Sequence, residues 1–290
     1  MQQQNSICNF ATSDSWVILS PIEQSIKKKI EAVGTPLKDW DINIYRGVLT
    51  GCNEAFIIDS EKRDEILANC QSEDERKRTA ELIRPILRGR DIKRYGYSWA
   101  NLWLINTHNG VKGRIPRIEI ADYPAVKAHL DRYWRNIKDR ADKGDTPYNL
   151  RNCAYLEDFN KPKAMWKIIG CNINFSFDYD CYLCNNAVNI ITGDEHQLLQ
   201  FVGIMNSKLF DWYLKLTTEA EVQGGGIQLY VTTLEKTLVK LDFPDELSHA
   251  VLLRVQGNAS DINVDDAVFN AYKLTKEEQL YIINDRRVNR

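Results

Sequence analysis

The sequence predicts an α+β fold with mixed sheets, inserted helices and a helical tail. Residues 173–181 alternate strictly between apolar and polar positions, which is typical of a strand. Residues 196–216 instead carry apolar residues at helical spacing. Strand-like and helix-like segments follow one another without regular alternation, which argues against a doubly wound sheet.

The N-terminal elements are a helix and a pair of short strands. "LSPIEQSIKKKIEAVG" predicts a helix that begins near Pro21 and ends at Gly34. The next segment, residues 36–59, contains β-type runs at 42–44 and 56–58. We expect these runs to form a hairpin with an irregular turn that contains Gly47 and Gly51.

A second helix is predicted from the capping pair Ser72 and Glu75 to Gly89. The basic residues that follow would then lie at a helix end and in the turn beyond it. "WANLWLINTH" predicts a buried strand, and residues 122–144 predict a helix with an apolar face at Val126, Leu130, Trp134 and Ile137. His129 falls on the polar side of that helix, where we expect it to be solvated.

The C-terminal half begins with the alternating strand and the helix at 196–216. "EVQGGGIQLYVTTLEK" predicts a glycine-rich turn and a strand-like run. Pro244 opens an acidic helical tail, in which Thr275 and Glu278 form the capping box of the last helix.

Composition indicates an ordinary globular protein of the cytoplasm. The chain has 43% hydrophobic and 27% charged residues, no apolar run of membrane-spanning length and no N-terminal signal pattern. Its seven Cys are scattered, which fits reduced thiols better than a disulfide framework. We expect no membrane partner.

Charge is distributed unevenly along the chain. Between Arg76 and Arg117 there are eleven Lys or Arg against Glu81 and Asp91, a net charge of +9, whereas the remaining residues sum to −11. A basic stripe on an acidic body is the electrostatic footprint of a nucleic-acid-binding protein. The same run also fits a solvated helix face.

No catalytic or metal site stands out in the sequence. Cys181 and Cys184 could begin a zinc site, but the nearest further ligands match no common zinc spacing, and buried thiols are the simpler interpretation. Asp91 and Lys93 could be part of a metal-dependent nuclease, with Glu81, Glu75 or Asp64 as a second carboxylate. We expect no metal and no catalytic residue in this chain.

Two loops carry side chains that could read base edges. "DKGDTPYNLRNCAY" groups Tyr148, Asn149, Arg151 and Asn152, and Arg and Asn are the side chains that pair with guanine and adenine. A polar loop with an Asn-stabilised turn is the structural alternative. "VQGGGIQLY" places Gln223 and Gln228 on either side of three glycines, which allow close backbone approach to a ligand or serve as a flexible turn.

Six segments together resemble a known family, the TaqI-like C-terminal specificity domain. They are "PLKDWDINIYRGVLTGCNEAFIID", "ELIRPILRGRDIKRY", "YPAVKAHL", "DKGDTPYNLRNCAY", "KPKAMWKII" and "VGIMNSKLFDWYL". This domain is the target recognition domain of type IIG restriction-modification enzymes and related adenine-specific DNA methyltransferases. The resemblance implies a lead-in at 1–34, a recognition domain at 35–245 and a helical tail at 246–290.

The resemblance implies a division of labour on double-stranded DNA. Phosphate contacts are expected from the basic residues Arg84, Arg88, Arg90, Lys93, Arg94, Lys112 and Arg114, and base readout from Tyr148, Asn149, Arg151, Asn152, Gln223 and Gln228. Within "RGRDIKRY" we expect Gly89 and Asp91 to be structural, with Asp91 ordering a neighbouring Arg.

The family's methyltransferase part implies a partner and a cofactor outside this chain. In that family a methyltransferase domain or subunit binds S-adenosylmethionine and acts on a flipped adenine, and an attached nuclease would need Mg²⁺. Its Asn/Asp-Pro-Pro-Tyr/Phe motif has no match here, because the chain contains no Pro-Pro pair. The leading interpretation is therefore a DNA recognition module. The alternatives are a nuclease using Asp91 and Lys93, and a protein-interaction subunit whose acidic tail docks a partner.

Overall fold

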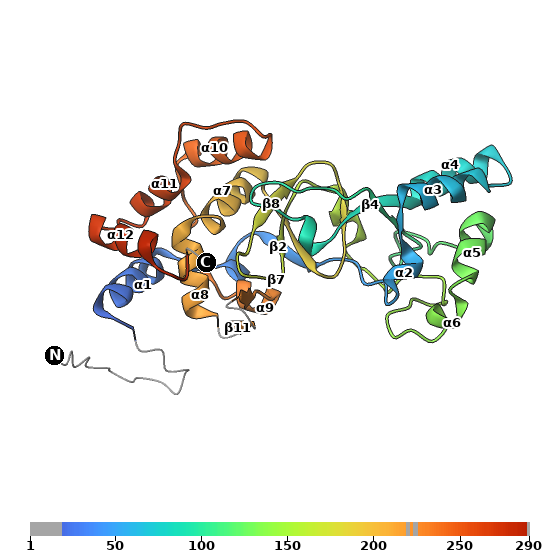
Figure 1. Cartoon of the computed structure of the whole chain (residues 1–290), viewed down its shortest axis with the longest axis horizontal. Helices are drawn as coiled ribbons and strands as arrows, with labels where there is room; N and C mark the ends of the chain where they lie inside the picture. The colour runs from blue at the N-terminus through green and yellow to red at the C-terminus, as the bar shows by residue number, and fades with distance from the viewer. Residues whose placement is uncertain (1–18, 219–220, 223–225, 289–290) are drawn as a thin grey trace.

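The computed structural model describes residues 19–218, 221–222 and 226–288. The molecule is elongated, with a helical lobe at one end, sheets in the middle and a second lobe with α2 to α6 at the other end (Figure 1). The helices are α1 Pro21–Val33, α2 Asn53–Phe56, α3 Ser60–Ala68, α4 Glu73–Leu82, α5 Pro124–Asp131, α6 Trp134–Ile137, α7 Glu195–Met205, α8 Lys208–Thr217, α9 Val231–Leu234, α10 Asp245–Val255, α11 Val264–Ala271 and α12 Lys276–Asn284.

Among the described residues the strands form four small sheets, and one parallel pair among antiparallel ones confirms the α+β fold with mixed sheets. The central sheet has the order β2-β10-β6-β8, and the sheet of the second lobe has the order β3-β5-β4-β9. The strands are β1 Thr35–Pro36, β2 Ile42–Arg46, β3 Ile57–Asp59, β4 Ile83–Leu87, β5 Leu102–Ile105, β6 Lys163–Lys167, β7 Ile169–Gly170, β8 Phe175–Asp178, β9 Leu183–Cys184, β10 Val188–Gly193, β11 Glu221–Val222, β12 Gly226–Gln228 and β13 Leu238–Val239.

The central sheet is shared between two hydrophobic cores. Ala164 and Trp166 of β6 join the core of the helical lobe, whereas Met165 between them joins the core of the second lobe. In β10, Ile191 and Ile190 divide in the same way. Successive side chains of a strand point to opposite faces, so each face of this one sheet closes a different core.

The predicted first and last helices are confirmed. Ser20 and Glu23 form a capping box at α1, and Thr275 and Glu278 form one at α12. The tail helices α10 to α12 pack against α7, α8 and α1 within one core (Figure 1). In the part of the chain that the structure describes, no helix has the length and apolar character needed to cross a membrane.

Two predictions in the first third of the chain are wrong. The helix capped by Ser72 ends at Leu82, and the next five residues form strand β4. Pro85 explains the change, because proline lacks the N–H that a helix interior needs and its ring clashes with the preceding turn. The expected hairpin is also absent from the described residues, since β2 pairs with β10 and β3 pairs with β5.

The helix expected at 196–216 is two helices separated by Asn206. Its side chain accepts a hydrogen bond from Phe175 N at 3.0 Å and donates one to Phe175 O at 2.7 Å, which ties the helix end to β8. Ser207 then caps α8 by accepting from Phe210 N. The side chain that stops α7 therefore also satisfies the backbone of β8 at Phe175.

The helix expected at 122–144 is likewise divided, into α5 and α6. Trp134 lies outside the core, with its ring 5.5 Å from that of Tyr148. His129 is buried rather than solvated, with Nε2 3.0 Å from Ala55 O. Helical spacing correctly identified the buried positions Val126, Leu130 and Ile137, but it was wrong for Trp134 and did not place the turn between the two helices.

Strand β8 is shorter than the alternating segment and is buried on both faces. Asp178, expected on a polar face, forms a fully buried ion pair with Lys163 directly across the sheet. Lys163 Nζ also donates to Phe159 O at 2.9 Å, and Asp178 accepts from Tyr97 OH at 2.9 Å. A buried charge pair of this kind requires such additional hydrogen bonds.

Candidate nucleic-acid interface

A cationic groove lies between the helical lobe and the second lobe. We name it the central groove, and it has a volume of about 980 Å³. It is lined by residues from both lobes and from the central sheet: Arg46, Asn53, Glu54, Ile57, Arg88, Gly89, Arg90, Leu102, Lys167, Ile168, Ile169, Asn185, Asn186, Ala187, Gln228 and Tyr230. The lining contains four basic residues and one acidic residue, so the groove suits a polyanion.

Asp91 orders the arginine at the edge of this groove. Arg88 donates from Nε and Nη2 to the two carboxylate oxygens of Asp91, at 3.0 and 2.9 Å, and its backbone N–H donates to Oδ2 at 2.8 Å. This pairing raises the pKa of the Arg88 guanidinium. Asp91 is 4% exposed, so the expected structural role fits its position.

The same contacts occupy the side chains that a nuclease site at Asp91 and Lys93 would need. Both oxygens of Asp91 are occupied by Arg88, and Lys93 Nζ donates to Arg90 O at 2.9 Å. Glu75 is buried and accepts from the backbone N–H groups of Gln71 and Ala125. Across the described ranges no group of three or more His, Cys, Asp or Glu is placed to hold a metal ion.

Close backbone approaches bring the turn at Asn185 into the groove. A Cβ on Gly47 would lie 2.0 Å from Asn185 O, and one on Gly89 would lie 3.2 Å from Ala187 O. Gly47 N–H donates to Val188 O at 2.8 Å. The two glycines therefore allow β2 and the turn after β4 to lie directly against the turn between β9 and β10.

Three groove cations have no carboxylate partner at ion-pair distance among the described residues, namely Arg46, Arg90 and Lys167. Burial lowers the pKa of Lys167, and the nearby positive charge of Lys93 lowers it further. Two ammonium groups that repel each other are stabilised when an anion lies between them. An anion bound beside both side chains would therefore offset this repulsion.

The structure distributes the predicted phosphate-contacting residues over several places. Arg88 and Arg90 line the central groove, with Lys93 near Lys167. Arg84 instead donates to Asn160 Oδ1 and to Cys181 O in a separate cavity of about 320 Å³. Arg94 donates to Asn206 O at 2.7 Å and lies over the Tyr95 ring. The basic run is thus not one continuous stripe.

Lys112 and Arg114 lie on a loop of the second lobe that is closed by a bridge between Val111 and Ile115. Arg114 forms an ion pair with Glu157 at 2.8 Å. Its charge is therefore compensated within the molecule, unlike that of Arg90.

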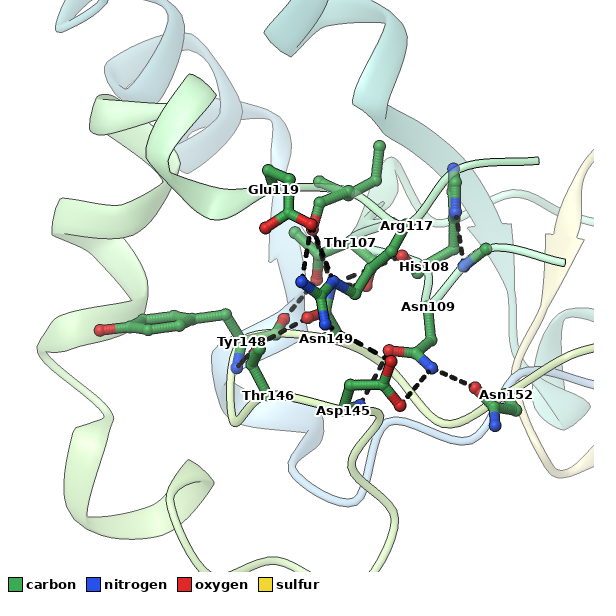
Figure 2. Close-up of polar contacts among 12 residues, drawn as sticks. Thr107, His108, Asn109, Arg117, Glu119, Asp145, Thr146, Tyr148, Asn149 and Asn152 are labelled. Atoms are coloured by element: carbon green, nitrogen blue, oxygen red, sulfur yellow. Dashed lines mark hydrogen bonds and ion pairs between the residues drawn. The ribbon is translucent and has the colours of Figure 1, made fainter. Parts of the chain in front are cut away.

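The loop predicted to read bases is held by contacts within the second lobe (Figure 2). Asn149 is 1% exposed, donates to Ile118 O at 2.9 Å and accepts from Thr146 Oγ1 at 2.6 Å. This burial corrects the expectation that Asn149 offers its amide to a base edge. Its position matches the structural alternative, an Asn-stabilised turn.

The other residues of this loop also have partners in the protein. Asn109 donates to Asp145 Oδ1 at 3.0 Å and contacts Asn152 Oδ1, as Figure 2 shows. Tyr148 OH donates to Asp131 Oδ1 at 2.6 Å, and Arg151 forms an ion pair with Asp142 at 2.7 Å. All of these lie outside the lining of the central groove.

Of the second predicted loop, Gln228 lines the central groove and Gln223 lies outside the described residues. Four residues of the groove lining were not predicted from the sequence, namely Arg46, Lys167, Asn185 and Asn186. Arg46 and Lys167 are the last residues of β2 and β6, so a basic residue ending a predicted strand was the available signal. The Asn-Asn pair is a turn signal that could have marked Asn185 and Asn186.

Comparison with known proteins identifies one family. The sequence model described as "TaqI-like C-terminal specificity domain" matches residues 84–237, and no curated protein matches. Among solved structures, the type IIG restriction endonuclease BpuSI is similar with a TM-score of 0.52 and 11% identity, over 91% of this chain and 33% of that one. The type IIL restriction-modification enzyme MmeI in complex with DNA is similar with a TM-score of 0.49 and 13% identity, over 88% of this chain and 32% of that one. The chain spans about a third of the length of these enzymes.

Proposed function

Because the chain belongs to the TaqI-like C-terminal specificity domain family, we propose that it is a DNA target recognition module and that duplex DNA binds in the central groove. The observation that carries this proposal is the set of uncompensated cations, Arg46, Arg90 and Lys167, in one groove. Phosphate contacts of this kind supply affinity and register, while base-edge contacts supply specificity.

The groove also offers side chains suited to base readout. Asn53, Asn185, Asn186 and Gln228 line it alongside the cations. Asn and Gln amides can donate and accept in a bidentate pair with adenine, so Asn53, Asn186 and Gln228 are further candidates for direct readout beside Tyr148, Arg151 and Asn152. Asn185 is less suited to this role, because it is buried and its Oδ1 accepts from Ala187 N–H at 3.2 Å.

The parent enzyme is proposed to contain the chemistry that this chain lacks. In it, the module positions DNA for an adenine methyltransferase domain or subunit that uses S-adenosylmethionine, and an attached nuclease would require Mg²⁺. The chain by itself is proposed to be non-catalytic. Its groove would bind the duplex and set which base pairs face the methyltransferase.

Salt dependence tests the groove. Binding of a short duplex is measured by fluorescence anisotropy between about 50 and about 200 mM salt, where each lost phosphate contact lowers the log–log slope by about 1. We expect Arg46→Ala, Arg90→Ala and Lys167→Ala each to lower the slope. Lys28→Ala, which removes an exposed charge from α1, is the matched control for Lys167→Ala and should leave the slope unchanged.

Two results would count against the proposal. A wild-type protein that binds no duplex at the lowest salt is not a recognition module in isolation. Slopes that are equal in wild type and in all three groove variants would place the phosphate surface elsewhere on the molecule.

A further inference from the structure

Two of the exposed large apolar side chains lie in the cationic groove. Ile169 is 51% exposed and Tyr230 is 47% exposed, and both belong to the groove lining. Leaving large apolar side chains in water is unfavourable, and an aromatic beside cations is suited to contact with a nucleic acid. We therefore considered which part of a bound duplex these two side chains would contact.

Backbone pairing fixes these side chains on one wall of the groove. Ile169 of β7 lies opposite Gln228 of β12, and Leu229 N–H donates to Ile168 O at 2.8 Å. Ile227 and Leu229 are buried, so the alternating positions Gln228 and Tyr230 share the outer side. An apolar, an amide and an aromatic side chain are thus presented together.

The buried side of the same segment holds this wall in place. Trp166 Nε1 donates to Leu229 O at 3.0 Å, and Ile227 and Leu229 join the core of the helical lobe. Tyr230 then caps the short helix α9 with its backbone. The wall is therefore supported by the central sheet and does not depend on contacts made within the groove.

Resting on the proposed function, we propose that Ile169 and Tyr230 form a wedge that inserts at one base step of the bound duplex, beside the base that Gln228 contacts. Apolar side chains inserted between base pairs unstack the step and kink the duplex. The cations Arg46, Arg90 and Lys167 hold the phosphates on either side of the distortion. Selection for an easily unstacked step then adds specificity that requires no hydrogen bond.

The wedge predicts a preference for duplex DNA that is already unstacked. A matched duplex is compared with the same duplex carrying one central mismatch, each at low salt. We expect wild type to bind the mismatched duplex at least about tenfold more tightly, because part of the unstacking cost is removed in advance. The double variant Ile169→Ala with Tyr230→Ala should lower this ratio to about 1 and retain the salt slope of wild type.

Matched variants separate the wedge from other effects. Tyr230→Phe keeps the ring and should keep the ratio, whereas Tyr230→Ala should lose most of it. Leu280→Ala removes an apolar side chain that is 57% exposed on α12, outside the groove, and should behave as wild type. All of these positions are exposed, and thermal unfolding checks that each variant folds.

The outcomes distinguish the wedge from the proposed function. If wild type binds duplex with a salt slope but shows equal affinity for matched and mismatched DNA, the wedge is wrong and the recognition role stands. A ratio that survives in the double variant also overturns the wedge. Absence of any duplex binding at low salt overturns both.

Discussion

The imidazole of His129 lies within the second lobe, 4% exposed, and is in contact with the backbone of α2 at Ala55. Burial lowers the pKa of this imidazole, because the charged form is disfavoured away from water. In the unfolded chain a histidine has a pKa of about 6.5. The folded state therefore requires a neutral His129 at pH values where the unfolded chain already binds a proton.

This difference predicts that acid destabilises the fold through His129. As pH falls below about 6.5 the unfolded state takes up the proton first, so the free energy of unfolding falls by up to about 1.4 kcal/mol per pH unit until the folded pKa is reached. Urea denaturation at about pH 7.5 and about pH 5.5 measures the change. In His129→Gln the fall should be smaller than in wild type, with the partly buried His108 as a background common to both. Parallel pH profiles would contradict this.

Single residues differ in how far the sequence could predict them. The pairing of Asp91 with Arg88 was predictable, because a carboxylate among arginines pairs locally and Arg88 is three residues away. The burial of Asn149 was not, because it depends on the backbone of Thr107 and Ile118 more than thirty residues earlier in the chain. Local chemistry identifies a polar loop, but only tertiary contacts decide which side of it faces water.

Among the elements, β4 and the end of β2 determine how the central groove is built. Arg88 and the turn after it directly follow β4, so the position of β4 places them at the groove. Gly47 allows the end of β2 to lie against Asn185. It was hard to predict that β4 is a strand, because Ile83 and Leu87 also have helical spacing. Pro85 was the signal against a helix at this position. Two strand pairings could not be predicted, since β2 pairs with β10 and β4 pairs with β9 far along the sequence, although β4 also pairs with the nearer β5.

The close approach at Gly47 predicts a sharp difference between two glycines. In Gly47→Ala the new methyl group would meet the backbone of Asn185, and we expect the free energy of unfolding to fall by about 1–3 kcal/mol. Gly96 has no atom within 4 Å of an added Cβ, so Gly96→Ala should change stability by no more than about 0.5 kcal/mol. Chemical denaturation of both variants provides the comparison. Equal losses would show that backbone freedom, and not the contact with Asn185, explains the role of Gly47.

For the whole molecule, the main feature is a helical lobe whose core draws on distant parts of the chain. Ile26 of α1, Phe210 of α8 and Val268 of α11 belong to one core. Lys29 pairs with Glu278 at 2.6 Å, and Trp212 Nε1 donates to Asp285 Oδ2 at 3.2 Å. The division of the chain into segments 1–34, 35–245 and 246–290 stays a prediction. Because of these contacts, we expect the two outer segments to stabilise the middle one.

Truncation tests this dependence. A chain ending at residue 245 loses the buried apolar residues of the tail, each contributing about 1.5–3 kcal/mol, which together exceed a typical domain stability of about 5–15 kcal/mol. We expect the shortened chain to lose cooperative unfolding of the helical lobe in thermal scans followed by circular dichroism. An unchanged transition would instead support an independent tail that is free to dock a partner.

The sheet shared by the two cores limits how the molecule can adjust to a ligand. One wall of the groove continues into the core of the helical lobe through Leu229, and the other continues into the core of the second lobe through α2. Both cores use the same strands, β6 and β10, so the two walls are joined through one sheet. Widening the groove would require one core to lose its packing, so in the proposed complex we expect the DNA to deform more than the groove.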